Sequence, residues 1–432
     1  MEYLDILILV VSFVILLAIG VPIAYSIGLS AILTMVISID VIPSFTTLSQ
    51  RIATALDSFA LLAIPFFIFA GQLMNRGGIA IRLIDFAKVL VGRLPGGLAF
   101  VNIMANMLFG AISGSAAASA SAIGGFMHPR MVKEGYDKAF SASVNITSAT
   151  TGLTIPPSNI LIVYSLASGG VSIAALFIAG YVPGILTGLA LMGVAAAFAY
   201  RKNYPVGEKA GLKESLIKFL EAIPSLLLLV IVIGGILAGI FTATEASAVA
   251  VLYTFILAMI YKEISLRDLP DIILKTVGTT AIVMLLVGTS MGLSWVLSYE
   301  NIPQEVSASL LSVSDNPIVI LLVINIILLL VGVFMDMTPA VLIFTPIFLP
   351  IVTTQLGLDP IHFGIIMVLN LSVGLCTPPV GSLLFIGCSV ADVGIGQVVK
   401  PLLPLFIAMI FVLLLITYVP ELSLWLPRMF GF

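Results

Sequence analysis

Long apolar runs, separated by short polar connections, follow one another along the chain from residue 4 to residue 426. An α-helix needs about 20 such residues to cross the hydrocarbon core of a bilayer. Recurring runs of this length predict an all-α polytopic membrane protein. Composition agrees, because 60% of the 432 residues are hydrophobic, 9% are charged and the mean hydropathy is +1.24. Soluble domains carry about 25% charged residues, so this chain could not cover its surface in water.

The ends of the apolar pattern and the two cysteines add little chemistry. The first run, from Leu4, has no basic leader and no small-residue cleavage site, so we expect a retained span rather than a signal peptide. Cys376 and Cys388 both lie in apolar surroundings, which predicts neither a disulfide framework nor a zinc site.

Charged connections orient the chain. Four connections hold most of the basic residues: 75–96, 128–138, 201–222 and 262–275. Three others hold no Lys or Arg: 165–174, 298–317 and 353–362. Because basic loops remain on the cytoplasmic side, we expect the first set inside, the second set outside and both termini outside.

The two halves of the chain resemble each other at an offset of 222 positions. Glycine, aspartate and proline recur at this spacing in the following pairs: Gly110 and Gly332, Gly135 and Gly357, Asp137 and Asp359, Pro156 and Pro378, and Pro157 and Pro379. Basic connections of the first half match connections of the second half that lack basic residues, so equivalent loops lie on opposite sides of the membrane. This indicates two inverted-topology repeats, an architecture of many secondary transporters.

The predicted division has a first repeat at 1–200, a basic cytoplasmic connection at 201–221 and a second repeat at 222–432. Each repeat is expected to contain a re-entrant hairpin, at 99–127 and 318–350, and a transmembrane helix broken by a Pro-Pro pair, at 139–164 and 363–390. The remaining crossings are expected at 4–38, 58–74, 176–200, 222–261 and 402–426.

The two Pro-Pro pairs lie where irregular backbone is most costly. A proline removes the hydrogen bond to the carbonyl four residues earlier, so Pro156 is expected to free the carbonyl of Gly152, and Pro378 that of Gly374. Inside a bilayer such carbonyls must be buried in protein or line a cavity, and a cation can satisfy several at once. A purely structural kink remains the alternative, but two breaks in equivalent places favour a site.

The hairpin tips supply further oxygen atoms. The first tip, "GAISGSAAASASAIGG", contains only small, hydroxyl and aliphatic residues, which suits an uncharged sodium site, although such residues also serve simple helix packing. We assign function to Ser113 and Ser115, and packing to Ser119 and Ser121. The second tip, "GVFMDMTPA", contains Asp336, an ionisable group in an apolar run and hence a functional candidate; its alternative role is to cap a hairpin helix.

Other polar residues are given structural roles or none. Glu245 is expected to lie at the start of a helix that Thr242 or Thr244 caps, and His128 and His362 are expected in loops as bystanders. The chain has no GxxxxGK[ST] loop, no HExxH and no GxSxG with a usable histidine. ATP hydrolysis is therefore unsupported, and an intramembrane enzyme is a weak alternative.

Six segments together resemble one family: "AIPFFIFAGQLMNRGGI", "GAISGSAAASASAIG", "TIPPSN", "GIFTATEAS", "GVFMDMTPA" and "CTPPVG". In this combination the whole chain resembles the large membrane subunit of tripartite ATP-independent periplasmic (TRAP) transporters, the DctM-like family, with sialic-acid members the most similar in appearance. The resemblance implies a sodium-driven elevator mechanism in the bacterial inner membrane. It also implies three partners: a small four-helix membrane subunit, a soluble periplasmic protein that delivers an organic acid, and that acid.

The resemblance also implies which residues bind. One sodium ion would lie where the first hairpin meets its break, and its ligands would be Ser113, Gly152, Ile155 and Pro157. A second would lie at the equivalent place, with Met335, Gly374, Thr377 and Pro379 as ligands, where a side-chain hydroxyl can come only from Thr338 or Thr377. The substrate would lie between the two, bound by Ser113, Ser115, Ser158 and Asn159, with a strongly desolvated Asp336 nearby. A passive, sodium-independent channel is the alternative, but the polar helix faces that it would need are missing.

Overall fold

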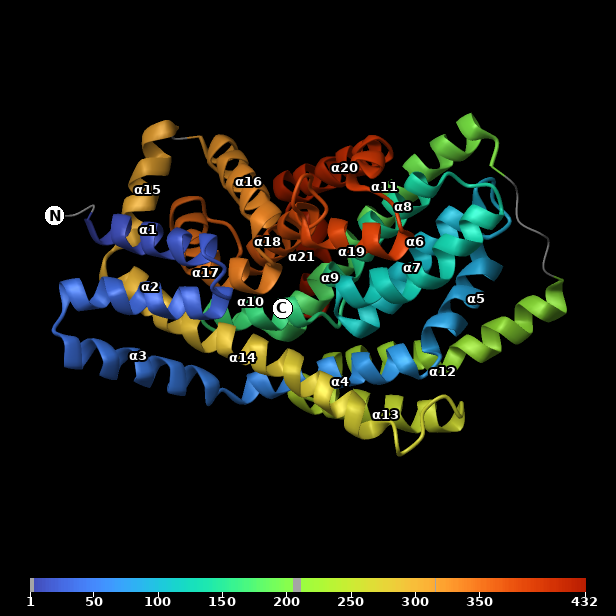
Figure 1. Cartoon of the computed structure of the whole chain (residues 1–432), viewed down its shortest axis with the longest axis horizontal. Helices are drawn as coiled ribbons and strands as arrows, with labels where there is room; N and C mark the ends of the chain where they lie inside the picture. The colour runs from blue at the N-terminus through green and yellow to red at the C-terminus, as the bar shows by residue number, and fades with distance from the viewer. Residues whose placement is uncertain (1–3, 205–210, 315) are drawn as a thin grey trace.

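The computed structural model describes residues 4–204, 211–314 and 316–432, so Lys209 of the basic connection lies outside the described residues. Every regular element in these ranges is helical (Figure 1). Among the described residues, eight helices are long and apolar enough to cross a membrane: 59–76, 173–202, 215–237, 243–260, 269–299, 317–334, 337–355 and 395–418. The prediction of an all-α multi-pass membrane protein is confirmed.

The first half of the chain forms eleven α-helices and one 3₁₀ turn within the described residues. They are α1 (Leu4–Ala18), α2 (Ile23–Ser38), α3 (Val41–Leu56), η1 (Phe59–Leu62), α4 (Ala63–Arg76), α5 (Ile79–Val91), α6 (Gly97–Ser113), α7 (Ala116–Lys133), α8 (Lys138–Ala149), α9 (Thr151–Thr154), α10 (Asn159–Ala167) and α11 (Ile173–Lys202). Two consecutive helices, α6 and α7, therefore lie where the hairpin was expected, and the predicted break separates α9 from α10; that the hairpin is re-entrant stays a prediction.

The second half follows the same order. Its elements are α12 (Leu212–Leu237), α13 (Ala243–Ile260), α14 (Leu269–Tyr299), α15 (Ile302–Val313), α16 (Pro317–Phe334), α17 (Met337–Pro350), a π-helical turn η2 (Ile351–Gln355), α18 (Pro360–Gly374), α19 (Ser382–Ala391), α20 (Ile395–Tyr418) and α21 (Glu421–Met429). Hairpin α16–α17 and the break between α18 and α19 lie at the expected positions. That the two halves are inverted repeats divided at 201–221 stays a prediction.

Two layers organise the helices (Figure 1). Helices α2, α3, α4, α13 and α14 pack side by side and form what we call the long layer. The two hairpins and the two interrupted helices, α6–α10 and α16–α19, lie against it and form what we call the hairpin core. In Figure 1 hairpin α6–α7 lies toward the right and hairpin α16–α17 toward the left, so their tips approach each other near the middle of the molecule.

Close glycine contacts hold each hairpin against its break. A Cβ atom on Gly152 would lie 2.3 Å from the Cα of Gly110, so the backbones of α6 and α9 touch. In the second half a Cβ atom on Gly374 would lie 2.6 Å from the Cα of Gly332. The second pair lies 222 positions after the first in the sequence, and in both pairs only glycine permits so close an approach.

Several sequence-based boundaries were wrong. The connections 75–96 and 298–317 were expected as loops, but they contain α5 and α15. Helix α3 was missed because its apolar residues lie on one face of the helix and so do not form a long apolar run in the sequence. The last crossing was expected at 402–426, yet α20 ends at Tyr418, before Pro420 separates it from α21; a proline has no N–H with which to continue the helical ladder.

Two histidines are not in loops, which corrects the expectation. His128 lies in α7, where its Nδ1 is 3.1 Å from the hydroxyl of Ser141. His362 lies in α18, where its Nδ1 is 2.6 Å from the hydroxyl of Ser423. Both are buried and fix helices to one another. The structural role of Glu245 is confirmed, because the residue forms a capping box with Thr242 at the start of α13.

Candidate functional site

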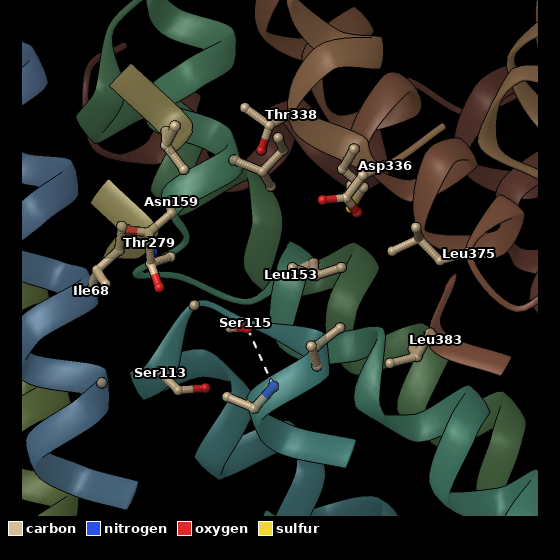
Figure 2. Close-up of a pocket in the computed structure, with 18 of the residues that line it drawn as sticks. Ile68, Ser113, Ser115, Leu153, Asn159, Thr279, Asp336, Thr338, Leu375 and Leu383 are labelled. Carbon is tan, nitrogen blue, oxygen red and sulfur yellow. Dashed lines mark hydrogen bonds between the residues drawn. The ribbon is translucent and has the colours of Figure 1, made fainter. Parts of the chain in front are cut away.

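A cavity of about 240 Å³ lies where the hairpin core meets the long layer (Figure 2). Its walls come from both hairpin tips, the starts of α10 and α19, and one face each of α4 and α14. Its lining includes Gln72, Asn75, Ser113, Gly114, Ser115, Ala116, Leu153, Asn159, Ile160, Thr279, Val283, Asp336, Met337, Thr338, Leu375, Ser382 and Leu383. Segments separated by more than 200 positions in the sequence therefore share one pocket.

Four helices begin at this pocket. Helix α7 begins at Ala116, α10 at Asn159, α17 at Met337 and α19 at Ser382, and each of these first residues lines the cavity. The first N–H groups of a helix have no partner inside the helix, and the helix dipole places a partial positive charge at this end. Such termini bind anions, so four of them around one cavity make it favourable for an anionic ligand.

The charged side chain at the pocket is acidic. Asp336 lines the cavity, and no Lys or Arg is among the described residues that do so. Asp336 occupies the N-cap position of α17, but its side chain makes no capping hydrogen bond. In Figure 2 the carboxylate points into the space bounded by Thr338, Leu153 and Leu375. The side chain faces the cavity, and the strong desolvation of Asp336 stays a prediction.

The first hairpin tip presents a free hydroxyl to the site. The Oγ of Ser113 is buried and has no hydrogen-bond partner among the described residues. Ser115 lies at the N-cap of α7, where its Oγ accepts a hydrogen bond from the N–H of Ala118 at 3.3 Å. Between them Gly114 has a φ of 61° and packs on Asn159. A hydroxyl that accepts one bond keeps its own hydrogen, so both serines can donate into the pocket.

The two residues after the first Pro-Pro pair differ in what they can do. The Oδ1 of Asn159 is buried without a partner, and this side chain lines the pocket. Ser158 is buried behind it, and its hydroxyl donates to the carbonyl of Leu153 at 2.5 Å. Because a hydroxyl has one hydrogen, Ser158 has none left for a substrate in this conformation. Of the five substrate-binding candidates, the structure brings Ser113, Ser115, Asn159 and Asp336 together at the cavity.

The first break collects oxygen atoms behind the tip of α6–α7. Helix α9 ends at Thr154, and the cis Pro156–Pro157 bond follows. The hydroxyl of Thr154 is buried without a partner, as is that of Ser113. Gly152 touches Gly110 of the hairpin, which places this break beside the tip. Gly152, Ile155 and Pro157 do not line the cavity; they lie behind its wall.

The second break is more fully hydrogen-bonded. We expected Pro378 to leave the carbonyl of Gly374 free, but that carbonyl accepts the N–H of Thr377 at 2.9 Å, so the expectation was wrong. The carbonyl of Thr377 accepts the N–H of Gly381 at 3.1 Å, and its hydroxyl donates to the carbonyl of Val373 at 3.0 Å. Each carbonyl retains a second lone pair. Met335, Gly374, Thr377 and Pro379 also lie outside the cavity lining.

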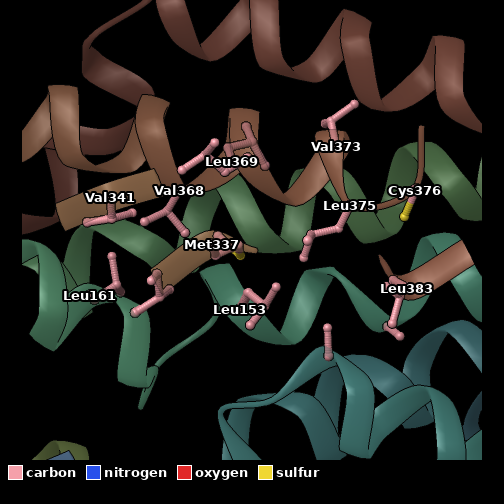
Figure 3. Packing of buried hydrophobic residues seen from close by; sticks show 14 of the residues in the cluster. Leu153, Leu161, Met337, Val341, Val368, Leu369, Val373, Leu375, Cys376 and Leu383 are labelled. Carbon is pink, nitrogen blue, oxygen red and sulfur yellow. The ribbon is translucent and has the colours of Figure 1, made fainter. Parts of the chain in front are cut away.

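Apolar side chains from both halves form one wall of the pocket (Figure 3). Leu153 precedes the first break, Met337 follows the second hairpin tip, and Leu375 and Leu383 flank the second break; all four are buried in a single hydrophobic cluster. The packing of these side chains holds the first break, between α9 and α10, close to the second break, between α18 and α19. Removing this apolar surface from water contributes roughly 25 cal/mol per Å² to the stability of this packing.

A buried amide network, which the sequence interpretation missed, supports the first tip. The Nδ2 of Asn106 donates to the Oδ1 of Asn102 at 2.7 Å and to the hydroxyl of Ser148 at 2.8 Å, and its Oδ1 accepts from Ser119 at 2.7 Å. The packing role expected for Ser119 is thereby confirmed. In the second half Asn370 donates to the Oδ1 of Asn325 at 2.6 Å. Asparagines inside apolar runs were a signal that could have revealed both networks.

The long layer adds polar residues that were also missed. Gln72 and Asn75 of α4 and Thr279 of α14 line the cavity opposite the hairpin tips. Gln72 and Asn75 stand at the end of an otherwise apolar run, which was visible in the sequence. No group of three or more His, Cys, Asp or Glu residues in the described part of the chain could hold a metal ion. The oxygen atoms at hand are thus hydroxyls, carbonyls and the single carboxylate of Asp336.

Comparison with known proteins identifies the family. The family model "Tripartite ATP-independent periplasmic transporter, DctM component" matches residues 10–422. The chain belongs to this family. This match confirms the resemblance drawn from the six sequence segments. Large subunits of TRAP transporters in general work with a periplasmic binding protein and a small membrane subunit.

Three relatives match almost the whole of this TRAP subunit. The uncharacterized protein YgiK of Salmonella typhimurium is 58% identical over 100% of this chain and 99% of its own length. The C4-dicarboxylate TRAP transporter large permease protein DctM of Pseudomonas aeruginosa is 41% identical over 94% of both chains. The sialic acid TRAP transporter large permease protein SiaM of Vibrio cholerae is 38% identical over 96% of both.

The characterised relatives are permease subunits rather than enzymes, which agrees with the sequence-based prediction. Among solved structures, the YdaH transporter of Alcanivorax borkumensis is similar, with a TM-score of 0.63, 13% identity, and coverage of 88% of this chain and 87% of that one. At this identity the similarity concerns the fold alone, and it agrees with a membrane transporter architecture.

Proposed function

We propose that this TRAP large subunit imports an organic acid together with sodium, and that the acid binds in the cavity between the two hairpin tips. The observation that supports this most directly is the convergence of four helix N-termini on a cavity with no basic side chain among its described lining residues. Such a site attracts an anion through backbone N–H groups and helix dipoles. Ser113, Ser115 and Asn159 supply the hydrogen bonds that orient its carboxylate.

Sodium ions would offset the repulsion between an anionic substrate and the carboxylate of Asp336. An anionic substrate beside Asp336 would place two negative charges in one cavity, where a like charge is unfavourable. Sodium ions behind the tips would offset this repulsion, so that acid and cation stabilise each other. The first site would use Ser113, Gly152, Ile155 and Pro157. Buried hydroxyls without partners are costly, and a cation would satisfy that of Ser113.

The second sodium site would use Met335, Gly374, Thr377 and Pro379. Its carbonyls are partly occupied by N–H groups, so the cation would use their remaining lone pairs. The hydroxyl of Thr377 already donates to the carbonyl of Val373, whereas the hydroxyl of Ser113 has no partner among the described residues. We therefore propose that the two sites differ: an unpartnered side-chain hydroxyl contributes at the first site, and backbone carbonyls contribute most at the second.

The substrate class follows from chemistry shared by the relatives. Their printed substrates include C4-dicarboxylates and sialic acid, both of which carry a carboxylate. The pocket's recognition elements fit that group, and the polar Gln72, Asn75 and Thr279 fit the remainder of a hydroxylated or dicarboxylic acid. The cavity of about 240 Å³ accommodates a small organic acid.

Transport would proceed by an elevator movement of the hairpin core along the long layer, in the bacterial inner membrane. A small four-helix subunit would associate with the long layer, and a periplasmic protein would deliver the acid. These steps rest on family membership and on the separation of the two layers, which meet at the cavity.

The test is uptake by proteoliposomes that contain this chain with its small subunit, supplied with radiolabelled succinate or N-acetylneuraminate and the periplasmic binding protein. We expect saturable uptake of one acid that needs both an inward sodium gradient and the binding protein. Equal uptake after sodium is replaced by choline would refute sodium coupling. Non-saturable flux without the binding protein would favour a passive channel.

A further inference from the structure

A second polar cavity lies at the other end of the boundary between the long layer and the hairpin core. Its volume is about 360 Å³. Helices α3 and α14 form most of its wall, and the C-terminal end of α10 closes it. The lining residues are Arg51, Thr54, Ala55, Ser58, Leu166, Met291, Ser294, Trp295 and Ser298.

The chemistry of this cavity is that of an oxyanion site. Arg51 is the charged residue of its lining, and its guanidinium lies 5.8 Å from the centre of the Trp295 ring. No described carboxylate forms an ion pair with it. Three hydroxyl-bearing residues also line the cavity, Thr54, Ser58 and Ser294, and a fourth, Ser298, donates its hydrogen to the carbonyl of Ser294 at 3.0 Å. An arginine fork binds a carboxylate through two parallel hydrogen bonds, and stacking on an aromatic face holds the fork in place.

The two cavities lie one after the other along the same face of α14. Thr279 and Val283 of α14 line the first cavity, whereas Met291, Ser294 and Ser298 line the second. These positions are spaced by multiples of three or four residues, so they share one face of the helix. Val283 and Met291 are about 12 Å apart along the helix axis.

Helix α10 shows the same order on the opposite wall. Asn159, Ile160 and Val163 line the first cavity and Leu166 the second. A third, smaller hollow lies beside the second and shares Ser58 and Leu166 with it, while Leu61, Ile162 and Ser165 extend it along α10. The second cavity therefore follows the first along this boundary, and the buried side chains of Val287 and Ile162 lie between them.

We propose that the Arg51 cavity is a receiving site that binds the carboxylate of the substrate before it reaches the pocket between the hairpin tips. This inference rests on the proposed function, namely that the chain transports an organic acid. Charge bias predicts that the end of α14 near Tyr299 and the connection after α10 face the outside, so the cavity opens on the side from which the acid arrives. Arg51 supplies there the positive side chain that the inner pocket lacks.

A phosphate of a lipid headgroup has the same oxyanion chemistry. Arginine and tryptophan also occur together at membrane interfaces, where they contact headgroups. Two observations favour the acid: the hydroxyl-bearing residues that line the cavity with Arg51, and the position of this cavity next to the substrate pocket along α14. The lipid source is one outcome of the test.

The test uses the fluorescence of Trp295 as a local probe. The chain has two tryptophans, so the Trp425→Phe variant leaves Trp295 as its single tryptophan, and the emission of a transporter with both Trp295→Phe and Trp425→Phe is subtracted to remove any signal of the small subunit. The variant is purified with the full transporter, placed in phosphatidylcholine nanodiscs, and titrated with succinate and with N-acetylneuraminate at constant ionic strength. Glycerol is the neutral control, and sodium chloride is the control for a simple anion.

We expect one of the acids to change Trp295 emission saturably, and the two controls to have no effect. Adding Arg51→Gln should raise the half-saturating concentration at least tenfold, and Arg51→Lys should give an intermediate value because its point charge lacks the fork. Lys400→Gln removes an exposed positive charge from α20, away from the cavity, and should leave the titration unchanged. Ser113→Ala, which alters the inner pocket, should leave it unchanged as well.

Three results would overturn the proposal. The first is an acid titration that Arg51→Gln does not alter. The second is an emission change that appears with phosphatidylglycerol nanodiscs and not with either acid, which would assign the cavity to lipid. The third is an absence of any acid-induced change, together with an uptake KM that Arg51→Gln leaves at the wild-type value. Sodium-independent uptake with an intact Arg51 titration would refute the proposed coupling and leave the receiving site standing.

Discussion

The contact between Gly110 and Gly152 offers the sharpest perturbation of the first hairpin. In Gly152→Ala the new methyl carbon would lie 2.3 Å from the Cα of Gly110 and 2.5 Å from its carbonyl carbon. Non-bonded carbon atoms rest about 3.5–4.0 Å apart, so the hairpin and the break must separate by about 1 Å or more. Both sides of the contact are backbone, so no rotamer change can relieve the clash.

Two effects follow from that separation. Overpacking of this kind costs about 1–3 kcal/mol of folding stability. The separation also moves Ser113 away from the oxygen atoms of the break, and metal–ligand distances tolerate changes of only about 0.2 Å. We therefore expect Gly152→Ala to lower Tm and to raise the sodium concentration needed for half-maximal uptake.

Gly125→Ala is the matched control. Gly125 lies in α7 of the same hairpin, is exposed, and has nothing within 4 Å of an added Cβ atom. Alanine there improves helix propensity by roughly 0.5–1 kcal/mol, so Tm should hold or rise and the sodium curve should stay unchanged. Thermal unfolding and sodium-dependent uptake are measured for both variants. If Gly152→Ala matches the wild-type protein in both measurements, the close contact has no role at the proposed sodium site.

Three further outcomes are expected. Asn106→Ala removes the hub of the buried amide network and leaves its partners unpaired, so unfolding should become easier by roughly 2–3 kcal/mol, as thermal denaturation can measure. Hydrogen bonds from the N–H and hydroxyl of Ser265 lower the pKa of Asp268. The stability they add is present above the usual carboxylate pKa and is lost as pH falls; the Tm difference between wild type and Ser265→Ala should therefore shrink from pH 7 to pH 3. In a cysteine-free background, cysteine at exposed Ser312 should react with an impermeant maleimide in intact cells, and cysteine at Lys213 should not; the opposite result would reverse the predicted orientation.

The sequence predicted the helices whose boundaries depend on apolar length and on proline. Both hairpins and both breaks could be located, because the Pro-Pro pairs recur 222 positions apart and a proline interrupts a helix wherever it lies. The elements that were missed, α3, α5 and α15, are amphipathic or short. Their apolar residues occupy one face, so they form no long run and resemble loops in a search for spans.

The site was predictable where one residue type decides its chemistry. Ser113, Ser115, Asn159 and Asp336 do meet at one cavity, since small, hydroxyl and charged residues are conspicuous within apolar runs. The hydrogen bond that occupies Ser158 was not predictable.

Local sequence likewise could not show what the breaks and the long layer contribute. The hydrogen bond from the N–H of Thr377 to the carbonyl of Gly374 depends on how the backbone turns after α18 ends. The contribution of Thr279 was equally hidden, because it depends on which face of α14 packs against the hairpin core.

The measurement that tests the central claim most directly is the sodium dependence of uptake by the Asp336→Asn variant, read beside its Tm. The substitution keeps the shape of the side chain and removes the negative charge that we propose sodium offsets in the pocket. The account predicts an unchanged Tm, much reduced uptake and a half-saturating sodium concentration raised severalfold. A lowered Tm with an unaltered sodium curve would contradict it, and would make Asp336 part of the scaffold rather than the site.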